Sequence, residues 1–280
     1  MGIVIGLDIG GSTTKIIGIN KHELLGTTLV RASDPVASAF GAFGKFTNEH
    51  AIDLKDIERV MVTGVGSSYL TGDLLHIKTI RTPEFQAIGL GGLYASGLDR
   101  AIVVSMGTGT AFISADESGV EHIIGSGVGG GTLLGLSNRM TNVRDFQMFT
   151  ELAETGDLGH IDLTIGDISR KEIPGLSSDT TASNFGKVND TATSSDIALG
   201  IVNLVFQSVG TAAVLSAKLK NISQIVFTGN LTLVSQGKRV LGAFSKLYGV
   251  DIIVPEHAEF ATAIGAALCD PDDPSRGLEI

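Results

Sequence analysis

The stretch IVIGLDIGGSTTKIIGI, residues 3–19, contains the pattern that decides the fold. It opens with a short apolar run, residues 3–9, which predicts a buried strand. Glycines and hydroxyl residues follow, and apolar runs return at 14–19 and 24–30, which predicts an antiparallel meander. After the meander we expect a helix over 35–50, strands over 59–63 and 77–80, and a helix over 84–98.

A second cycle of the same kind begins near residue 100. Residues 101–105 (AIVVS) predict a strand that leads into Gly107-Thr108-Gly109-Thr110, and the next strand begins at 111–114. Because this repeats the opening, we expect two related halves, an N-terminal domain of residues 1–98 and a C-terminal domain of residues 99–280. The remaining expected elements are helices over 145–160, 196–219, 234–248 and 260–268, and strands over 224–227 and 251–254. The last helix is a candidate for packing back on the first domain.

One polar stretch, residues 155–195, is rich in Asp, Ser and Thr. Its composition fits a long surface excursion and an insertion on the substrate side equally well.

Composition excludes several classes of protein. A net charge of −10 argues against tracking a nucleic-acid backbone, which requires clustered Lys and Arg. Cys269 is the only cysteine, so an intrachain disulfide and a cysteine-rich metal site are excluded. The N-terminus has no signal-peptide pattern, and no apolar run reaches 18 residues. We therefore expect a soluble cytoplasmic protein without nucleic-acid or membrane partners.

The first motif that carries chemistry follows the first predicted strand. It contains Asp8, Gly10, Gly11, Ser12, Thr13 and Lys15. Two adjacent glycines let successive N–H groups point at one anion, and the hydroxyls and the lysine add donors and positive charge. Asp8 offers the oxygen ligand that Mg²⁺ prefers. These residues predict a phosphate and magnesium site. The alternative is a plain tight hairpin with a solvated lysine. The motif is not a Walker A loop, because the GK[ST] ending is missing.

Two further glycine-rich turns point to the same chemistry. Gly107–Thr110 follows a strand, and residues 125–132 (GSGVGGGT) precede a predicted helix whose N-terminus attracts phosphate. A flexible linker is the alternative for residues 125–132. Three turns of this type in one chain predict a nucleotide site together more strongly than any of them alone.

Two single residues complete the candidates. Asn230 closes Thr228-Gly229-Asn230 after a strand, a turn where adenosine could lie, although an ordinary strand-to-helix turn explains it equally well. Glu84 follows Pro83 and opens a predicted helix among apolar neighbours. A kinase acting on an alcohol needs a general base, and Glu84 is a candidate. A Glu stabilised by the helix dipole is the alternative.

The chain as a whole resembles the type II pantothenate kinases, which belong to the superfamily of acetate and sugar kinases, Hsc70 and actin. The resemblance rests on GLDIGGSTTKI (6–16), PEFQAIGLG (83–91), MGTGT (106–110), GSGVGGGTLLGL (125–136), DTTASNFG (179–186) and the FxxAIGAAL ending (260–268). It implies an α/β, two-domain, actin-like (ribonuclease H-like) ATPase fold, with duplicated mixed sheets flanked by helices.

The resemblance also implies roles for particular residues. Residues 8–15 hold the phosphates of ATP, with Mg²⁺ at Asp8, and Glu84 matches the catalytic Glu of the family. The reaction is transfer of the γ-phosphate of ATP to the primary hydroxyl of pantothenate, which opens coenzyme A synthesis, and members are homodimers. The other residues expected to contact the nucleotide are Thr108, Gly130, Gly131, Thr132, Leu133, Leu134 and Phe146.

One position departs from the family pattern. The family has an Arg shortly before the glycine loop that contacts the acyl substrate, and His122 falls there in this chain. Arg is always charged and presents forked donors, whereas the charge of His depends on its surroundings. The departure leaves open a kinase of a different small alcohol, or a non-catalytic nucleotide-binding or metabolite-sensing protein.

Two related families fit less well. Sugar kinases of the repressor-related group carry a clustered cysteine zinc motif. The activators of 2-hydroxyacyl-CoA dehydratases need cysteines for a bridging iron–sulfur cluster. A single cysteine supports neither.

Overall fold

The computed structural model describes residues 2–11, 13–21, 23–31, 34–171 and 173–273.

The first sheet contains the predicted meander of residues 3–30 and two further strands. The strand β1 pairs antiparallel with β2, and β2 with β3, while β4 and β5 extend the other side of β1 in parallel. The resulting order is β3-β2-β1-β4-β5, with the bounds β1 Ile3–Ile9, β2 Thr13–Asn20, β3 Glu23–Arg31, β4 Ile57–Thr63 and β5 Thr79–Arg81.

The second sheet repeats this arrangement. Its order is β12-β11-β6-β7-β8, with β6–β7–β8 as the antiparallel meander and β11 and β12 added in parallel. The predicted fold class is therefore confirmed. The strands are β6 Ala101–Met106, β7 Thr110–Asp116, β8 Gly119–Ser126, β11 Gln224–Thr228 and β12 Asp251–Ile253. The sequence did not predict β8, because it is an exposed edge strand without a continuous apolar face.

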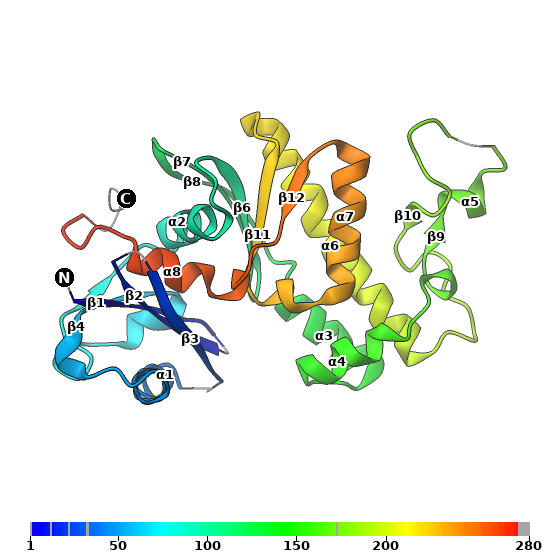
Figure 1. Cartoon of the computed structure of the whole chain (residues 1–280). Helices are drawn as coiled ribbons and strands as arrows, with labels where there is room; N and C mark the ends of the chain where they lie inside the picture. Colours follow the sequence, from blue (N-terminus) through cyan, green and yellow to red (C-terminus); the bar gives the residue numbers. More distant parts are fainter. Residues whose placement is uncertain (1, 12, 22, 32–33, 172, 274–280) are drawn as a thin grey trace.

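Helices cover both sheets (Figure 1). They are α1 Pro35–Glu49, α2 Glu84–Ser96, α3 Gly130–Thr141, α4 Phe146–Glu154, α5 Ile165–Ile168, α6 Ser194–Lys220, α7 Ser235–Tyr248 and α8 Ala261–Ala267. Short 3₁₀ helices are η1 Leu54–Asp56, η2 Val65–Tyr69, η3 Leu158–His160, η4 Asn230–Leu233 and η5 Ala258–Phe260. The expected helix over 145–160 is wrong beyond Glu154. There the carboxylate of Asp157 accepts the N–H of Gly159 and begins η3 instead.

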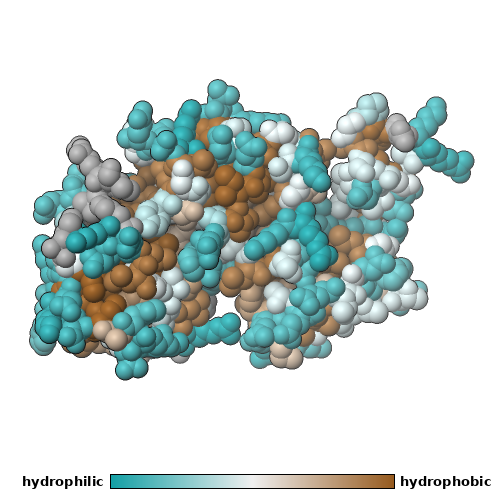
Figure 2. All heavy atoms as spheres, in the orientation of Figure 1, coloured by the Kyte–Doolittle hydropathy of each residue, from teal (hydrophilic) through white to brown (hydrophobic). Residues whose placement is uncertain are grey.

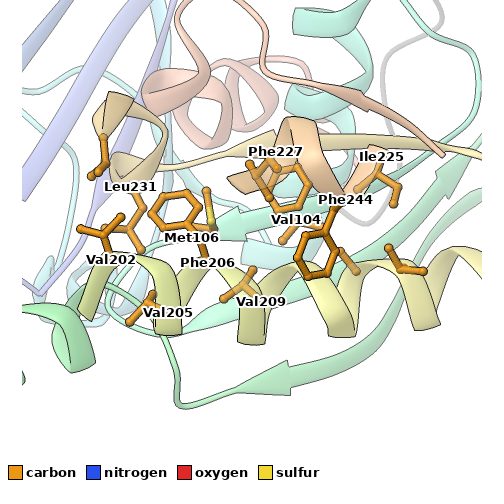
Figure 3. Packing of buried hydrophobic residues seen from close by; sticks show 14 of the residues in the cluster. Val104, Met106, Val202, Val205, Phe206, Val209, Ile225, Phe227, Leu231 and Phe244 are labelled. Atoms are coloured by element: carbon orange, nitrogen blue, oxygen red, sulfur yellow. The ribbon is translucent and has the colours of Figure 1, made fainter. Parts of the chain in front are cut away.

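The core of the second half lies between its sheet and α6. Figure 3 shows Val104, Met106, Ile225 and Phe227 facing Val202, Val205, Phe206 and Val209 of α6, beside Leu231 and Phe244. Among the described residues, α6 is the one helix long and apolar enough to cross a membrane. Because 61% of its most apolar window is buried inside the protein, α6 acts here as a core helix.

The helices α2 and α8 cross at very short distance and join the two halves. A Cβ on Gly91 would lie 1.8 Å from the carbonyl oxygen of Ala261, and one on Gly265 would lie 1.8 Å from that of Ala87. These glycines allow backbone-to-backbone packing. α8 also packs on the first sheet, where Ile17, Ile19 and Ile264 share one cluster. The boundary at 98/99 stays a prediction. α8 packs on the first sheet, and Ile88 of α2 packs with residues of the second sheet, so each side of the boundary contributes a helix to the other half.

The polar stretch 155–195 forms an arm at the far right of Figure 1. It contains α5 and a two-stranded sheet of β9 Leu163–Thr164 and β10 Thr181–Ser183. Its anchor is the buried carboxylate of Asp162, which accepts the N–H of Phe185 at 2.8 Å and the amide of Asn203 on α6 at 2.6 Å. Part of the block 179–186 therefore fixes the arm to α6.

Candidate active site

Three parallel strands of the first sheet end at one edge. β1 carries Asp8 next to its last residue, β4 is followed by Gly64, and Glu84 comes three residues after β5. In open α/β sheets, ligands bind outside the carboxyl ends of the strands. Figure 2 shows a notch that opens on the lower side of the molecule, between the half that contains β1–β3 and the half that contains α3 and α4.

Asp8 and Lys15 form the charged pair of this edge. They face each other in the β1–β2 register, and the carboxylate lies 3.6 Å from Nζ. Residues directly opposite each other in a β-ladder have side chains on one face. The turn between them is held by the N–H of Gly10, which donates to the carbonyl of Thr13 at 2.9 Å. The sequence placed both residues in one motif, and the hairpin brings them together.

Glu84 belongs to the same group of charges. Loss of hydration in its protein surroundings raises the pKa of its carboxyl from the ordinary value of 4.5. The negative charge of Asp8 raises this pKa further, and the positive charge of Lys15 lowers it. Glu84 opens α2 directly after Pro83 and remains open to solvent. A carboxylate with a raised pKa is a better proton acceptor near neutral pH.

Gly64 is a residue of this edge that the sequence analysis did not select. Its φ is +84°, and a Cβ there would lie 2.6 Å from Oδ1 of Asp8. Glycine is thus required both by the backbone angle and by the position of the Asp8 carboxylate. The available signal was a glycine directly after the strand RVMVT.

The second and third glycine-rich turns pack on each other. The N–H of Gly130 donates to the carbonyl of Gly107, and that of Gly131 to the carbonyl of Thr108, both at 2.9 Å. A Cβ on Gly129 would lie 2.8 Å from the backbone of Gly109. The glycines of residues 125–132 therefore permit close contact between the two loops.

This packing corrects part of the expectation for the glycine loop. The N–H groups of Gly130 and Gly131 already donate within the protein, so in this structure they are not free for a phosphate. Leu133 is 0% exposed and lies in the hydrophobic core, which removes it as a nucleotide contact. Thr108 stays exposed, Thr132 is half-buried, and Leu134 and Phe146 are half-buried against the core.

Asn230 lies beside the first phosphate motif. Its Nδ2 donates to Oγ1 of Thr13 at 3.4 Å, across the two halves of the molecule. The sequence had associated this residue with adenosine, whereas its contact is with the loop expected to hold phosphate. Gly11 is exposed, and Ser12 lies outside the described residues.

His122 contacts the residue that follows the candidate base in the chain. Its ring stacks on that of Phe85, with parallel planes and centroids 4.0 Å apart. Phe85 follows Glu84 in α2, so β8 reaches the candidate catalytic position through this stack. Phe85 itself was quoted in the sequence only as part of a motif, and nothing in the sequence pairs it with His122.

A second pair of charges crosses between the halves. Arg31, at the end of β3, lies 3.7 Å from the carboxylate of Asp145, which caps α4. Both side chains are largely exposed. No local pattern predicts this pair, because its members are far apart along the chain.

No cluster of three or more His, Cys, Asp or Glu that could hold a metal occurs among the residues that the structure describes. A magnesium ion that accompanies a nucleotide needs only one or two carboxylates, since phosphates and water supply its other ligands. Asp8 supplies one carboxylate at this edge and fits that requirement.

Comparison with known proteins assigns the family. The model of the family described as Fumble matches residues 100–268. A type II pantothenate kinase of Bacillus cereus is 31% identical over 94% of this chain and 97% of its own length. The chain belongs to the Fumble family of type II pantothenate kinases. Another similar protein, from Staphylococcus epidermidis, is 26% identical over 94% of this chain and 98% of its own length.

Solved structures place this member of the Fumble family in a wider group by fold alone. The activator of the 2-hydroxyisocaproyl-CoA dehydratase from Clostridium difficile, with bound ADPNP, is similar with a TM-score of 0.68 and 16% identity, covering 95% of this chain and 92% of the other. A ROK family glucokinase from Streptomyces griseus, in complex with glucose and AMPPNP, has a TM-score of 0.60 and 14% identity, covering 95% and 98%.

The single cysteine of the chain lies in the interior. Cys269 is fully buried, and burial raises the pKa of its thiol to about 12. Its Sγ donates to the carbonyl of Gly265 at 3.4 Å. A thiol in this state is neither a ready metal ligand nor a nucleophile.

Proposed function

We propose that this protein transfers the γ-phosphate of ATP to the primary hydroxyl of pantothenate, the first step of coenzyme A synthesis. The single observation that supports it most is the position of Glu84, with a raised pKa, beside the Asp8–Lys15 pair at the carboxyl edge of the first sheet. Family membership supports the choice of acceptor, because the relatives from Bacillus cereus and Staphylococcus epidermidis are named type II pantothenate kinases.

In the proposed mechanism, Glu84 accepts the proton of the acceptor hydroxyl as the oxygen attacks the γ-phosphate. Lys15 would stabilise negative charge that develops on the transferred group. Positioning and charge neutralisation supply most of the acceleration in phosphoryl transfer. Mg²⁺, when bound, neutralises phosphate charge, and we propose Asp8 as its protein ligand.

The nucleotide site that we propose lies between the two halves. From the first half it uses residues 8–15, and from the second it uses Thr108, Thr132 and Asn230. Leu134 and Phe146 border this region as half-buried side chains. Gly130 and Gly131 contribute by letting the two loops pack closely. We propose that the two halves are domains of residues 1–98 and 99–280.

The acceptor site that we propose is bordered by the stack of Phe85 and His122. The stack supports our proposal that His122 belongs to the acceptor site, at the position where the family pattern has Arg. The same departure favours a second candidate function, a kinase of another small alcohol or a nucleotide-binding sensor without catalysis.

An assay of ADP release, coupled to NADH oxidation and run with and without pantothenate, tests the proposed function. We expect turnover that depends on pantothenate and is lost in Glu84→Gln. Binding of ATP without such turnover would support the sensor. Turnover with another alcohol from a substrate panel would support the alternative kinase.

We also propose a cytoplasmic homodimer, as the family resemblance implies. The arm exposes apolar side chains, with Ile168 60% and Val188 52% exposed. Burial of such residues against a second copy would remove apolar surface from water. Light scattering after size exclusion tests this proposal, and we expect a dimer mass that Ile168→Asp shifts toward the monomer. A monomer at all concentrations would exclude the dimer.

A further inference from the structure

Arg31 lies on the face of the first sheet that carries the Asp8–Lys15 pair. In the β1–β2 register Lys15 is opposite Asp8. In the β2–β3 register Lys15 is opposite Leu29, and Thr13 is opposite Arg31. Residues opposite each other in a ladder, and residues two apart in a strand, point to the same side of a sheet. Arg31 is therefore a second cation on the face that carries the phosphate motif.

The two cations of this face differ in how far their charge is neutralised. Lys15 is buried, and its Nζ lies 3.6 Å from the carboxylate of Asp8. The side chain of Arg31 is 63% exposed, and within the described part of the chain its guanidinium makes an ion pair with Asp145, at 3.7 Å, and no hydrogen bond. An exposed ion pair of this kind contributes little to stability. The charge of Arg31 is therefore more available to a ligand than that of Lys15.

The ion pair occupies only part of each side chain. Oδ1 of Asp145 accepts the N–H groups of Gln147 and Met148, at 2.9 and 3.0 Å, and so caps α4. Oδ2 faces a single nitrogen of Arg31, Nη1. A guanidinium has five N–H donors. Arg31 can therefore donate to a second anion while its contact with Asp145 persists.

The position of Arg31 suits an anion that is bound between the two halves. Figure 1 shows the end of β3 directed toward α4, and these two elements belong to the two sides of the notch in Figure 2. Thr13, the ladder partner of Arg31, contacts Asn230 of the second half. ATP keeps a net negative charge after it binds Mg²⁺, and forked guanidinium donors match phosphate oxygens.

We propose that Arg31 is a phosphate ligand of the nucleotide site, with its guanidinium donating to the triphosphate while the nearby charge of Asp145 weakens its attraction for the anion. This inference rests on the nucleotide site proposed above and adds to it a residue that lies outside the three glycine-rich turns. Arg31 then links the first sheet, the phosphates and α4.

Calorimetry of the whole chain with Mg²⁺-ATP and with Mg²⁺-tripolyphosphate tests this proposal. We expect Arg31→Met to weaken both ligands about tenfold, the size of one hydrogen bond to a charged group. Arg31→Lys should recover part of this loss, because it keeps the charge but not the forked donors. Asp145→Asn should tighten both ligands about two- to fivefold, the range of exposed charge interactions, since Asn still caps α4 but carries no negative charge.

Arg100 and Asp116 are the matched control, because they form an ion pair of the same residue types at the same 3.7 Å. They lie at the amino end of β6, whereas Gly107 follows its carboxyl end. Arg100→Met and Asp116→Asn should leave both affinities unchanged. Circular dichroism and thermal melts of all variants verify folding.

Three results would overturn the proposal. The first is an unchanged affinity of Arg31→Met for both ligands. The second is a loss in Asp145→Asn as large as that in Arg31→Met, which would make the pair a clasp between the halves. The third is a loss in Arg31→Met for ATP but not for tripolyphosphate, which would assign Arg31 to the nucleoside. None of these measurements contains pantothenate, so a failure of the proposed acceptor would show in the turnover assay and leave this result standing.

Discussion

The rings of Phe85 and His122 are parallel, with their centroids 4.0 Å apart, and they join β8 to the first turn of α2. The stack brings His122 against the residue that follows the candidate base in α2, although 38 positions separate Glu84 and His122 along the chain (122 minus 84). We propose that this departure from the family Arg lies in the acceptor site, where it would bear on substrate binding.

His122→Arg should tighten pantothenate binding. An Arg at this position can stack on Phe85 and present forked donors, so we expect the KM for pantothenate to fall about tenfold, the size of one charge-assisted hydrogen bond. Initial-rate kinetics at saturating ATP measure this effect. His76→Arg, on an exposed turn, adds the same charge elsewhere. An unchanged KM would remove His122 from the acceptor site.

Glu84→Gln should leave ATP binding nearly intact and reduce kcat by about 10²-fold or more, the usual contribution of a general base. The amide keeps the size of the carboxyl but cannot accept the proton. Glu117→Gln, in the exposed turn between β7 and β8, is the matched control. Retained turnover in Glu84→Gln would show that another group, or none, acts as the base.

The pH profile of kcat should show an acid limb that is set by the raised pKa of Glu84. Since a base works in its deprotonated form, kcat falls as the pH drops through this pKa, and the acid limb lies above the ordinary Glu value of 4.5. Lys15 lowers this pKa, so in Lys15→Met the limb should move to higher pH even if the rate is low. A limb that does not move would mean that it reports a different group.

Gly91→Ala should destabilise the protein, because a methyl group cannot fit 1.8 Å from the carbonyl oxygen of Ala261. We expect a loss of about 3 kcal/mol in the free energy of unfolding, at the upper end of overpacking effects. Gly41→Ala is the control, since its Cβ would meet nothing within 4 Å in the middle of α1, and it should stabilise by about 0.5 kcal/mol. Denaturant titration measures both variants. Equal stability of the two would contradict the close crossing of α2 and α8.

Asp196 should make the start of α6 sensitive to acid. Burial alone raises the pKa of its carboxyl, but hydrogen bonds from the N–H groups of Thr193 and Asp157, and from His160, outweigh burial and hold it well below the ordinary 3.8. A lowered folded pKa contributes stability above the unfolded pKa, and this stability is lost as the pH falls through the folded value.

The test for Asp196 is thermal melting of Asp196→Asn between pH 7 and pH 2. At pH 7 the variant should melt below wild type, because an amide nitrogen in place of Oδ2 cannot accept the hydrogen bonds from the N–H of Thr193 and from His160, and this weakens the capping box of α6. The difference should shrink below pH 3.8, where the wild-type carboxyl begins to lose its advantage. A difference that stays constant with pH would show that the charge of Asp196 does not contribute.

The sequence by itself determined the fold class and the elements that repeat in both halves. Its period-two and apolar runs, ended by glycine, report local structure directly, which is why β1 to β3 and β6 and β7 were predicted. The edge strand β8 was missed because its residues face solvent, where no apolar pattern is needed. The first motif was also sufficient to bring Asp8 and Lys15 together, since a tight hairpin fixes their register.

Only the tertiary structure decided which distant residues meet. The contacts of Thr13 with Asn230, of Phe85 with His122 and of Gly91 with Ala261 depend on how the two sheets and α8 pack, and no local pattern encodes them. The same packing turned the glycine loop from expected phosphate donors into a contact between loops, because backbone N–H groups donate to whichever carbonyl the fold places nearest.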